Sequence, residues 1–194
     1  MPQDNLISAR ASMYGLFASL YMNGGLKKDY DNVLLILKTI SQDPFVDDAG
    51  DIASSMLSML TSEKEAVLTE YEVLFNLPFG DFINSSASFY FDEREFGEKT
   101  IETKEIMNEA GYVKADFYTA GEDEFGFLCA LSSRLLKDEK IELQERLFDV
   151  VLSPLVGGFL KAQEDSERAE FYKEVSKLFA LFVAFEKSYF EFYA

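Results

Sequence analysis

Residues 171–185 read FYKEVSKLFALFVAF, and this stretch decides the fold class. Its large apolar side chains recur at intervals of three and four residues, which is the spacing of one face of an α-helix. The members of this stripe are Phe171, Val175, Leu178, Phe179, Phe182 and Phe185. We therefore expect a helix over about residues 166–192 that buries an aromatic face in a core.

The same spacing recurs in the rest of the chain and predicts further helices. They cover about residues 5–22, 29–40, 48–60, 62–76, 100–110, 122–137 and 140–162. Residues 62–65, SEKE, fit a capping box that would open the fourth of these helices. Residues 78–87 are rich in turn formers and predict a loop. Pro154 predicts a kink or a break within the last of these helices.

No turn dipeptide between alternating apolar residues indicates a β-hairpin, and no fixed-period repeat is present. The length of 194 residues fits one domain. The sequence therefore predicts an all-α protein, a single-domain bundle of about eight helices over residues 1–194.

Charge is the strongest signal in the composition. Asp and Glu number 35 against 18 Lys and Arg, which gives a net charge of −17. Such a charge repels nucleic acid and anionic lipid, and it attracts basic partners. Solubility alone also explains an acidic surface, so the charge permits a basic ligand without requiring one.

The residue types exclude most catalytic and metal-binding sites. The chain has no histidine and one cysteine, Cys129, which lies among apolar residues and is expected to be buried and inert. Nucleophile–histidine pairs and zinc sites of His and Cys are therefore excluded, and no Gly-rich phosphate loop is present. We expect no catalytic residues, no metal and no cofactor, and hence not an enzyme.

Two observations concern membranes and export. Residues 1–5 carry no basic region, so we expect no secretory signal here. The longest apolar run, residues 178–185, is too short to span a bilayer, so we expect no stable membrane insertion.

Four short segments follow one another along the chain: YEVLF at 71–75, ASFY at 87–90, EDEFGFL at 122–128 and LSPL at 152–155. Their sequence, order and spacing resemble the TorD/DmsD/NarJ family of redox-enzyme maturation chaperones. Ala87 stands where the family has Glu, Glu124 where it has His, and Leu155 where it has Trp. The proline that the family places before Asp123 is also absent, so the chain resembles a divergent branch.

The resemblance implies an all-helical cytoplasmic protein that serves anaerobic respiration. Such a chaperone binds the apo form of a molybdenum-cofactor oxidoreductase, or its twin-arginine leader peptide, and holds it for cofactor insertion before export. The resemblance also implies a monomer or a domain-swapped dimer. No nucleic acid partner is expected.

The candidate client-binding residues come from the four segments, and each also has a reading as core packing or helix capping. They are Tyr71, Phe75, Ser88, Tyr90, Glu122, Asp123, Glu124, Phe125, Pro154 and Leu155. Aromatic rings beside carboxylates suit a leader that is apolar in its middle and basic at one end. The alternative function is a non-catalytic helical adaptor or regulatory subunit that binds a folded partner.

Overall fold

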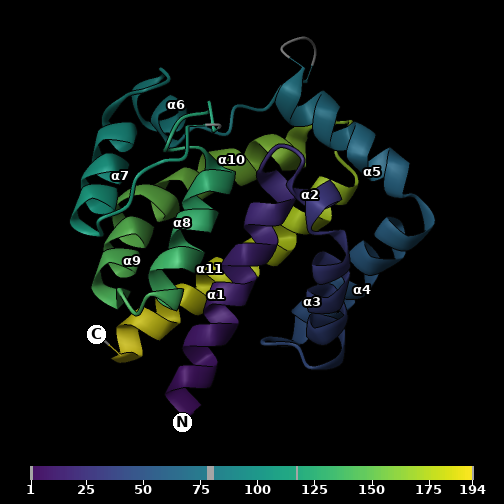
Figure 1. The fold of residues 1–194 in the computed structure, drawn as a ribbon. Coiled ribbons are helices and arrows are strands. Elements are labelled where there is room, and N and C mark those ends of the chain that lie inside the picture. Colours follow the sequence, from purple (N-terminus) through teal and green to yellow (C-terminus); the bar gives the residue numbers. More distant parts are fainter. Residues whose placement is uncertain (1, 78–80, 117, 194) are drawn as a thin grey trace. The chain divides into compact units, whose positions relative to one another are not determined.

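The computed structural model describes residues 2–77, 81–116 and 118–193. Every element named in this part of the chain is a helix, and 77% of the chain is helical, which confirms the all-α prediction (Figure 1). The one β feature among the described residues is an isolated antiparallel bridge between Ser86 and Glu124. The contacts gather in two compact units, residues 1–23 with 85–158 and residues 24–84 with 159–194. One folding domain over the whole chain stays a prediction.

The first unit is built on two helices that pack along each other, α1 (Pro2–Tyr21) and α8 (Phe125–Lys137). Gly126 allows this approach, because a Cβ atom there would lie 2.9 Å from the backbone nitrogen of Met22. The Ser133 hydroxyl donates to the Ala11 carbonyl over 2.7 Å, across the same contact. The unit also contains α6 (Ala87–Asp92), α7 (Glu98–Glu109), α9 (Ile141–Leu147), a π-helix (Phe148–Leu152) and the start of α10 (Ser153–Asp165).

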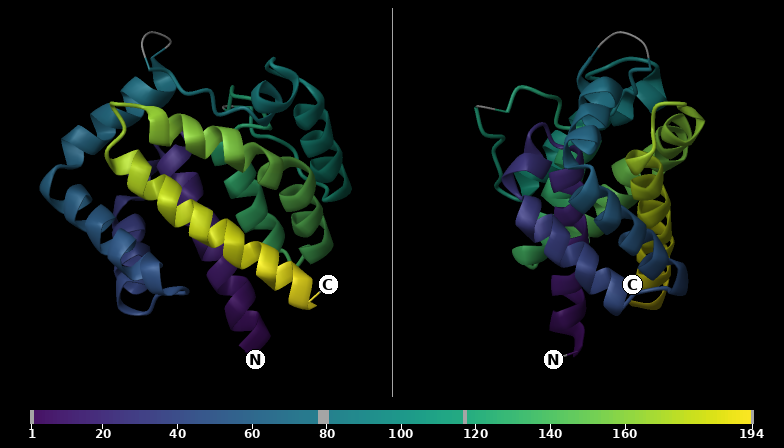
Figure 2. Two further views of the ribbon diagram at one scale, coloured as in Figure 1. Left: turned by 180° about the vertical axis from the view of Figure 1, so that it is seen from behind. Right: turned by 90° about the vertical axis from the view of Figure 1, so that its right-hand side faces the viewer.

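The second unit pairs α3 (Tyr30–Gln42) with α4 (Asp47–Ser62), which a short turn connects (Figure 2). The aromatic helix α11 (Phe171–Tyr193) packs against α4 and α5 (Lys64–Tyr71). The predicted stripe lies inward at Phe171, Val175, Leu178, Phe179 and Phe182, which are all buried. The unit also contains α2 (Gly25–Lys28), a π-helix (Glu72–Asn76) and the end of α10.

Two predicted helix starts are wrong. The capping box at residues 62–65 does not form, because α4 continues to Ser62 and its hydroxyl donates to the Ser58 carbonyl instead. The last helix begins at Phe171 rather than near residue 166. Glu70, on α5, caps it there by accepting hydrogen bonds from the backbone N–H groups of residues 170–172 at 2.8–3.0 Å.

The irregularity predicted at Pro154 is a π-helix. Proline has no N–H to donate and cannot continue an α-helical ladder. Pro154 is the second residue of α10, and the five residues before that helix form the π turn. The Ser153 N–H donates to the Phe148 carbonyl, five residues back. The prediction missed two short helices, α2 and α6; α6 begins at the end of the predicted loop, of which residues 78–80 lie outside the described residues.

Candidate functional site

A buried polar cluster holds the start of α6 against the loop before α8. Asp123 accepts hydrogen bonds at Oδ2 from the Ser86 hydroxyl over 2.7 Å and from the Ser88 backbone N–H over 2.8 Å. Ser88 in turn accepts from the Thr100 backbone N–H over 3.3 Å. Asp123 is only 1% exposed. The sequence predicts this carboxylate at the start of the helix over residues 122–137. In the structure α8 begins two residues later, and Asp123 caps the start of α6 instead.

The hydrogen bonds of this cluster keep Asp123 ionised. Burial by itself raises the pKa of a carboxyl group. At Asp123 the donors from Ser88, Ser86 and Thr100 more than offset burial, so its pKa lies below the ordinary value. The negative charge is therefore a fixed part of the fold at neutral pH.

Glu122, which precedes Asp123 in the chain, is also buried and forms ion pairs. Its carboxylate lies 3.3 Å from the Lys114 ammonium and 3.6 Å from that of Lys104. Lys114 also donates to the Ala120 carbonyl over 2.8 Å. Glu122 therefore anchors the loop between α7 and α8.

Glu124 differs from both neighbours. It is half-buried at the N-cap position of α8, where its side chain makes no capping hydrogen bond. Its carboxylate accepts one long hydrogen bond, 3.4 Å from the Ser85 hydroxyl, and it has no ion pair within the described part of the chain. Burial raises the pKa of Glu124, and the charges of Asp123 and Glu95 raise it further, while the Gly121 backbone N–H and the Ser85 hydroxyl offset this rise only in part. A cation here would offset the repulsion among the three carboxylates.

The other predicted site residues of the first unit divide between core and surface. Phe125 is fully buried with its ring edge-on to Tyr21, 4.7 Å between centroids, and Leu155 is buried as well. Pro154 is exposed. Tyr90 is half-buried, and its ring leaves no room for a side chain at Gly158, since a Cβ there would lie 2.5 Å from Cδ1 of the ring.

Burial raises the pKa of Tyr90 to about 12, so its hydroxyl stays protonated at neutral pH. A protonated phenol can donate a hydrogen bond to a carbonyl group of a bound chain.

Tyr71 and Phe75 belong to the second unit. Their rings pack on Tyr172 of α11, with centroids 6.1 Å and 4.9 Å from it. Tyr71 is buried and Phe75 is half-buried. These contacts explain the aromatic residues of the segment 71–75 as core packing, with Phe75 still partly exposed.

Sequence reasoning missed Phe96, in the turn between α6 and α7. Its side chain is 66% exposed and its backbone φ is +55°, in the left-handed region that bulky residues avoid. Its ring lies against Gly121, because a Cβ there would be 3.7 Å from Cε1 of the ring. The local sequence EREFG gives no periodic signal, so only the structure identifies this residue.

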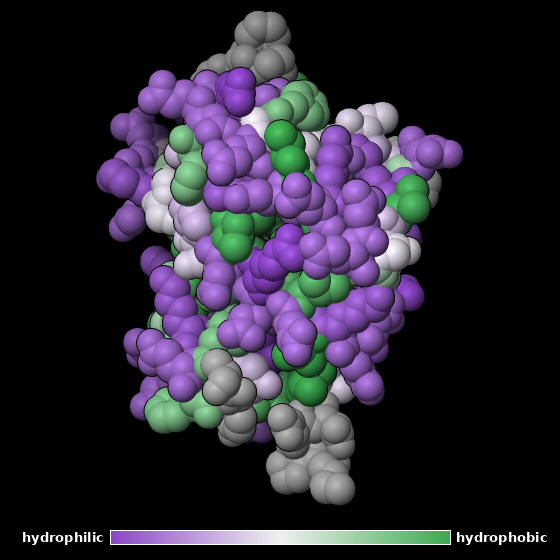
Figure 3. Space-filling view, turned by 90° about the vertical axis from the view of Figure 1, so that its left-hand side faces the viewer, coloured by the Kyte–Doolittle hydropathy of each residue, from purple (hydrophilic) through white to green (hydrophobic). Residues whose placement is uncertain are grey.

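The face shown in Figure 3 is largely hydrophilic, with apolar residues scattered between the polar ones. Across residues 2–77, 81–116 and 118–193, no group of three or more Asp, Glu or Cys side chains is arranged to hold a metal ion. Every helix in these residues also falls short of the length and apolar character that a bilayer crossing needs.

Comparison with known proteins identifies the family. Residues 42–175 match the family model described as nitrate reductase delta subunit, which covers most of the chain and all four of the short segments. A comparison with curated proteins finds no match. The family is non-catalytic, and its partners are enzymes of the nitrate reductase type. The chain belongs to the nitrate reductase delta subunit family, a family of redox-enzyme maturation chaperones related to TorD and NarJ.

Proposed function

We propose that this chain is a cytoplasmic chaperone for a molybdenum-cofactor oxidoreductase. It binds the apo form of the enzyme, its twin-arginine leader, or both, and holds the client until the cofactor is inserted and export begins. The observation that carries the proposal is Glu124, a half-buried carboxylate beside Asp123 and Glu95 that has no cation of its own within the described residues.

An arginine of the client supplies the missing cation. A guanidinium group donates two parallel hydrogen bonds to a carboxylate, and it loses less hydration than an ammonium on binding. The net charge of −17 adds a long-range attraction for a basic segment. Both contributions weaken as the salt concentration rises.

The burial of the predicted residues divides their roles. In the first unit we assign direct client contact to those that reach the surface, namely Glu124, Tyr90 and Pro154. In the second unit, taken by itself, Phe75 is the one that reaches the surface. We assign positioning to those that are buried, namely Tyr71, Ser88, Glu122, Asp123, Phe125 and Leu155. Asp123 holds α6, and hence Tyr90, against the loop that carries Glu124.

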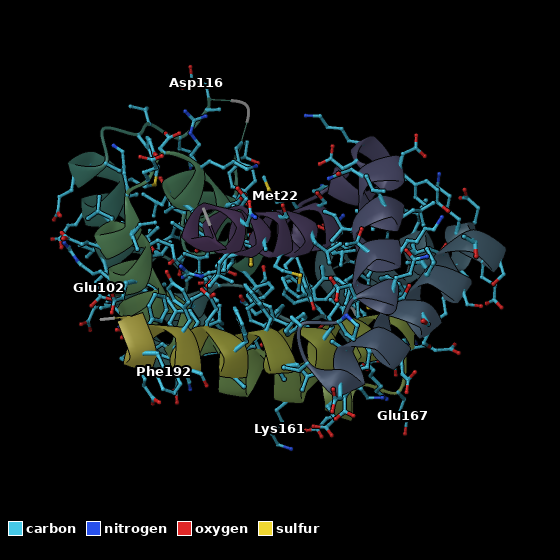
Figure 4. The ribbon with its side chains drawn as sticks, turned by 90° about the horizontal axis from the view of Figure 1, so that it is seen from below. Met22, Glu102, Asp116, Lys161, Glu167 and Phe192 are labelled. Atoms are coloured by element: carbon cyan, nitrogen blue, oxygen red, sulfur yellow. The ribbon has the colours of Figure 1, made fainter. Side chains whose placement is uncertain are left out.

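The test is capture from native extract of cells grown by anaerobic respiration, with wild type and Glu124→Gln compared side by side. Phe192→Ala is a surface control on the second unit, where Phe192 is 82% exposed at the end of α11 (Figure 4). We expect wild type and the control to retain a leader-bearing, cofactor-poor oxidoreductase, and Glu124→Gln to retain much less. Recovery of a folded, cofactor-loaded assembly in equal amounts by all three would instead indicate an adaptor.

A further inference from the structure

The turn between α6 and α7 is built to expose an aromatic ring. Asp92 closes it by accepting a hydrogen bond from the Glu98 backbone N–H over 2.6 Å. Gly97 leaves room for this contact, because a Cβ there would push the Asp92 carboxylate out of its place. Both Glu93 and Phe96 have φ of +55°. The turn is thus tightly constrained, and it holds Phe96 in a conformation that phenylalanine disfavours.

The Phe96 ring has a free face. No other aromatic ring and no cation contacts it among the residues that the structure describes. The nearby Phe91 differs, because the Lys99 ammonium lies 3.9 Å from the centroid of its ring. A phenyl group this exposed buries little apolar surface, and backbone strain of this kind gathers at binding sites.

Phe96 and Glu124 border the same residue. The Phe96 ring lies against Gly121, and the Glu124 backbone N–H donates to the Gly121 carbonyl over 3.3 Å. The neighbour of Phe96 in the turn, Glu95, lies close enough for its charge to act on Glu124. An aromatic face beside two carboxylates attracts a cation both through the ring and through the charges.

We propose that Phe96, with Glu95 and Glu124, forms a subsite for one arginine side chain of the client, the guanidinium lying on the ring and facing the carboxylates. The inference rests on the proposed function and adds a specificity-determining residue to it. A planar guanidinium stacks on a ring and binds a carboxylate at once, which an ammonium does less well. The subsite therefore distinguishes arginine from lysine.

The experiment measures the affinity of two synthetic peptides by fluorescence anisotropy. Each has an apolar helix-forming segment that follows either two arginines or two lysines. We expect wild type to bind the arginine peptide about fivefold more tightly than the lysine peptide. Phe96→Leu, which keeps an apolar side chain in the same backbone conformation, should bring this ratio close to one, and Phe96→Tyr should restore it.

Phe96→Gly is the second variant, because glycine adopts a positive φ without strain. It should keep or raise the thermal unfolding midpoint while it loses the preference for arginine. Phe96→Leu or Phe96→Gly with the arginine preference of wild type would overturn the subsite and leave the proposed function intact. Failure of wild type to bind either peptide would overturn both the subsite and leader binding.

Discussion

Two adjacent carboxylates in the first unit have opposite environments. Asp123 is buried, accepts hydrogen bonds from Ser86 and Ser88, and has a lowered pKa. Glu124 is half-buried, accepts one long hydrogen bond from Ser85, and has a raised pKa. The fold supplies the first carboxylate with close donors, and it supplies the second only with weak ones. Of two acidic residues in one motif, the one that the fold stabilises less is therefore the better candidate for binding.

Removing the satisfied carboxylate should have the largest effect on stability. Asp123→Ala leaves the Ser86 hydroxyl and the Ser88 N–H without their acceptor in a buried site, and we expect the free energy of unfolding to fall by about 3 kcal/mol. Urea denaturation measures it. Asp116→Ala is the control, because Asp116 lies exposed in the same loop (Figure 4), and it should change stability by less than about 0.5 kcal/mol. Equal stability of the two variants would show that Asp123 does not hold α6.

Removing the Glu124 carboxylate should instead affect binding. Glu124→Gln keeps the size of the side chain and removes its charge, so we expect about a tenfold weaker affinity for an arginine-bearing leader peptide at low salt. Its unfolding midpoint should stay at that of wild type or rise slightly. Isothermal titration at two salt concentrations checks this, since the difference from wild type should shrink at high salt. An unchanged affinity at low salt would remove Glu124 from the site.

The lowered pKa of Asp123 predicts how the stability of the fold depends on pH. A carboxyl group whose pKa is lower in the folded than in the unfolded state stabilises the fold fully above its unfolded pKa. For Asp123 that ordinary value is 3.8, and its contribution is lost as the pH falls through the lower, folded pKa. The free energy of unfolding of Asp123→Asn should therefore fall less steeply below about pH 4 than that of wild type. Parallel curves for the two proteins would contradict the lowered pKa.

The smallest expected effect is at Phe96. Phe96→Gly relieves the left-handed strain but makes the unfolded chain more flexible, so the free energy of unfolding should rise by no more than about 1 kcal/mol. Thermal and urea unfolding measure this change. A clear loss of stability would mean that the exposed ring supports the fold.

Local patterns predicted the helices, and long-range contacts decided their ends. The apolar spacing of residues 171–185 is sufficient to identify α11, because it depends only on neighbours along the chain. Its start at Phe171 depends on Glu70, about a hundred residues earlier, and the start of α6 depends on Asp123. No local pattern encodes either cap, so the boundaries could not be predicted from the sequence.

The candidate site, like the helices, could be predicted from the sequence only in part. The acidic segment at residues 122–124 could be found by its resemblance to the family, but its three members could not be ranked. The structure separates them by their partners: lysines for Glu122, hydroxyl and amide donors for Asp123, and one long hydrogen bond for Glu124. Phe96 was missed because its exposure and its positive φ follow from the turn around Gly97, which has no sequence period.

The most direct test of the chaperone assignment compares two states of one client. The affinity of wild type is measured for the captured oxidoreductase without its cofactor and for the same enzyme after cofactor loading. A maturation chaperone must release a finished client, so we predict at least about tenfold tighter binding of the apo form, a difference of about 1.4 kcal/mol. Equal affinity for the two forms would contradict the account and identify the chain as a constitutive adaptor.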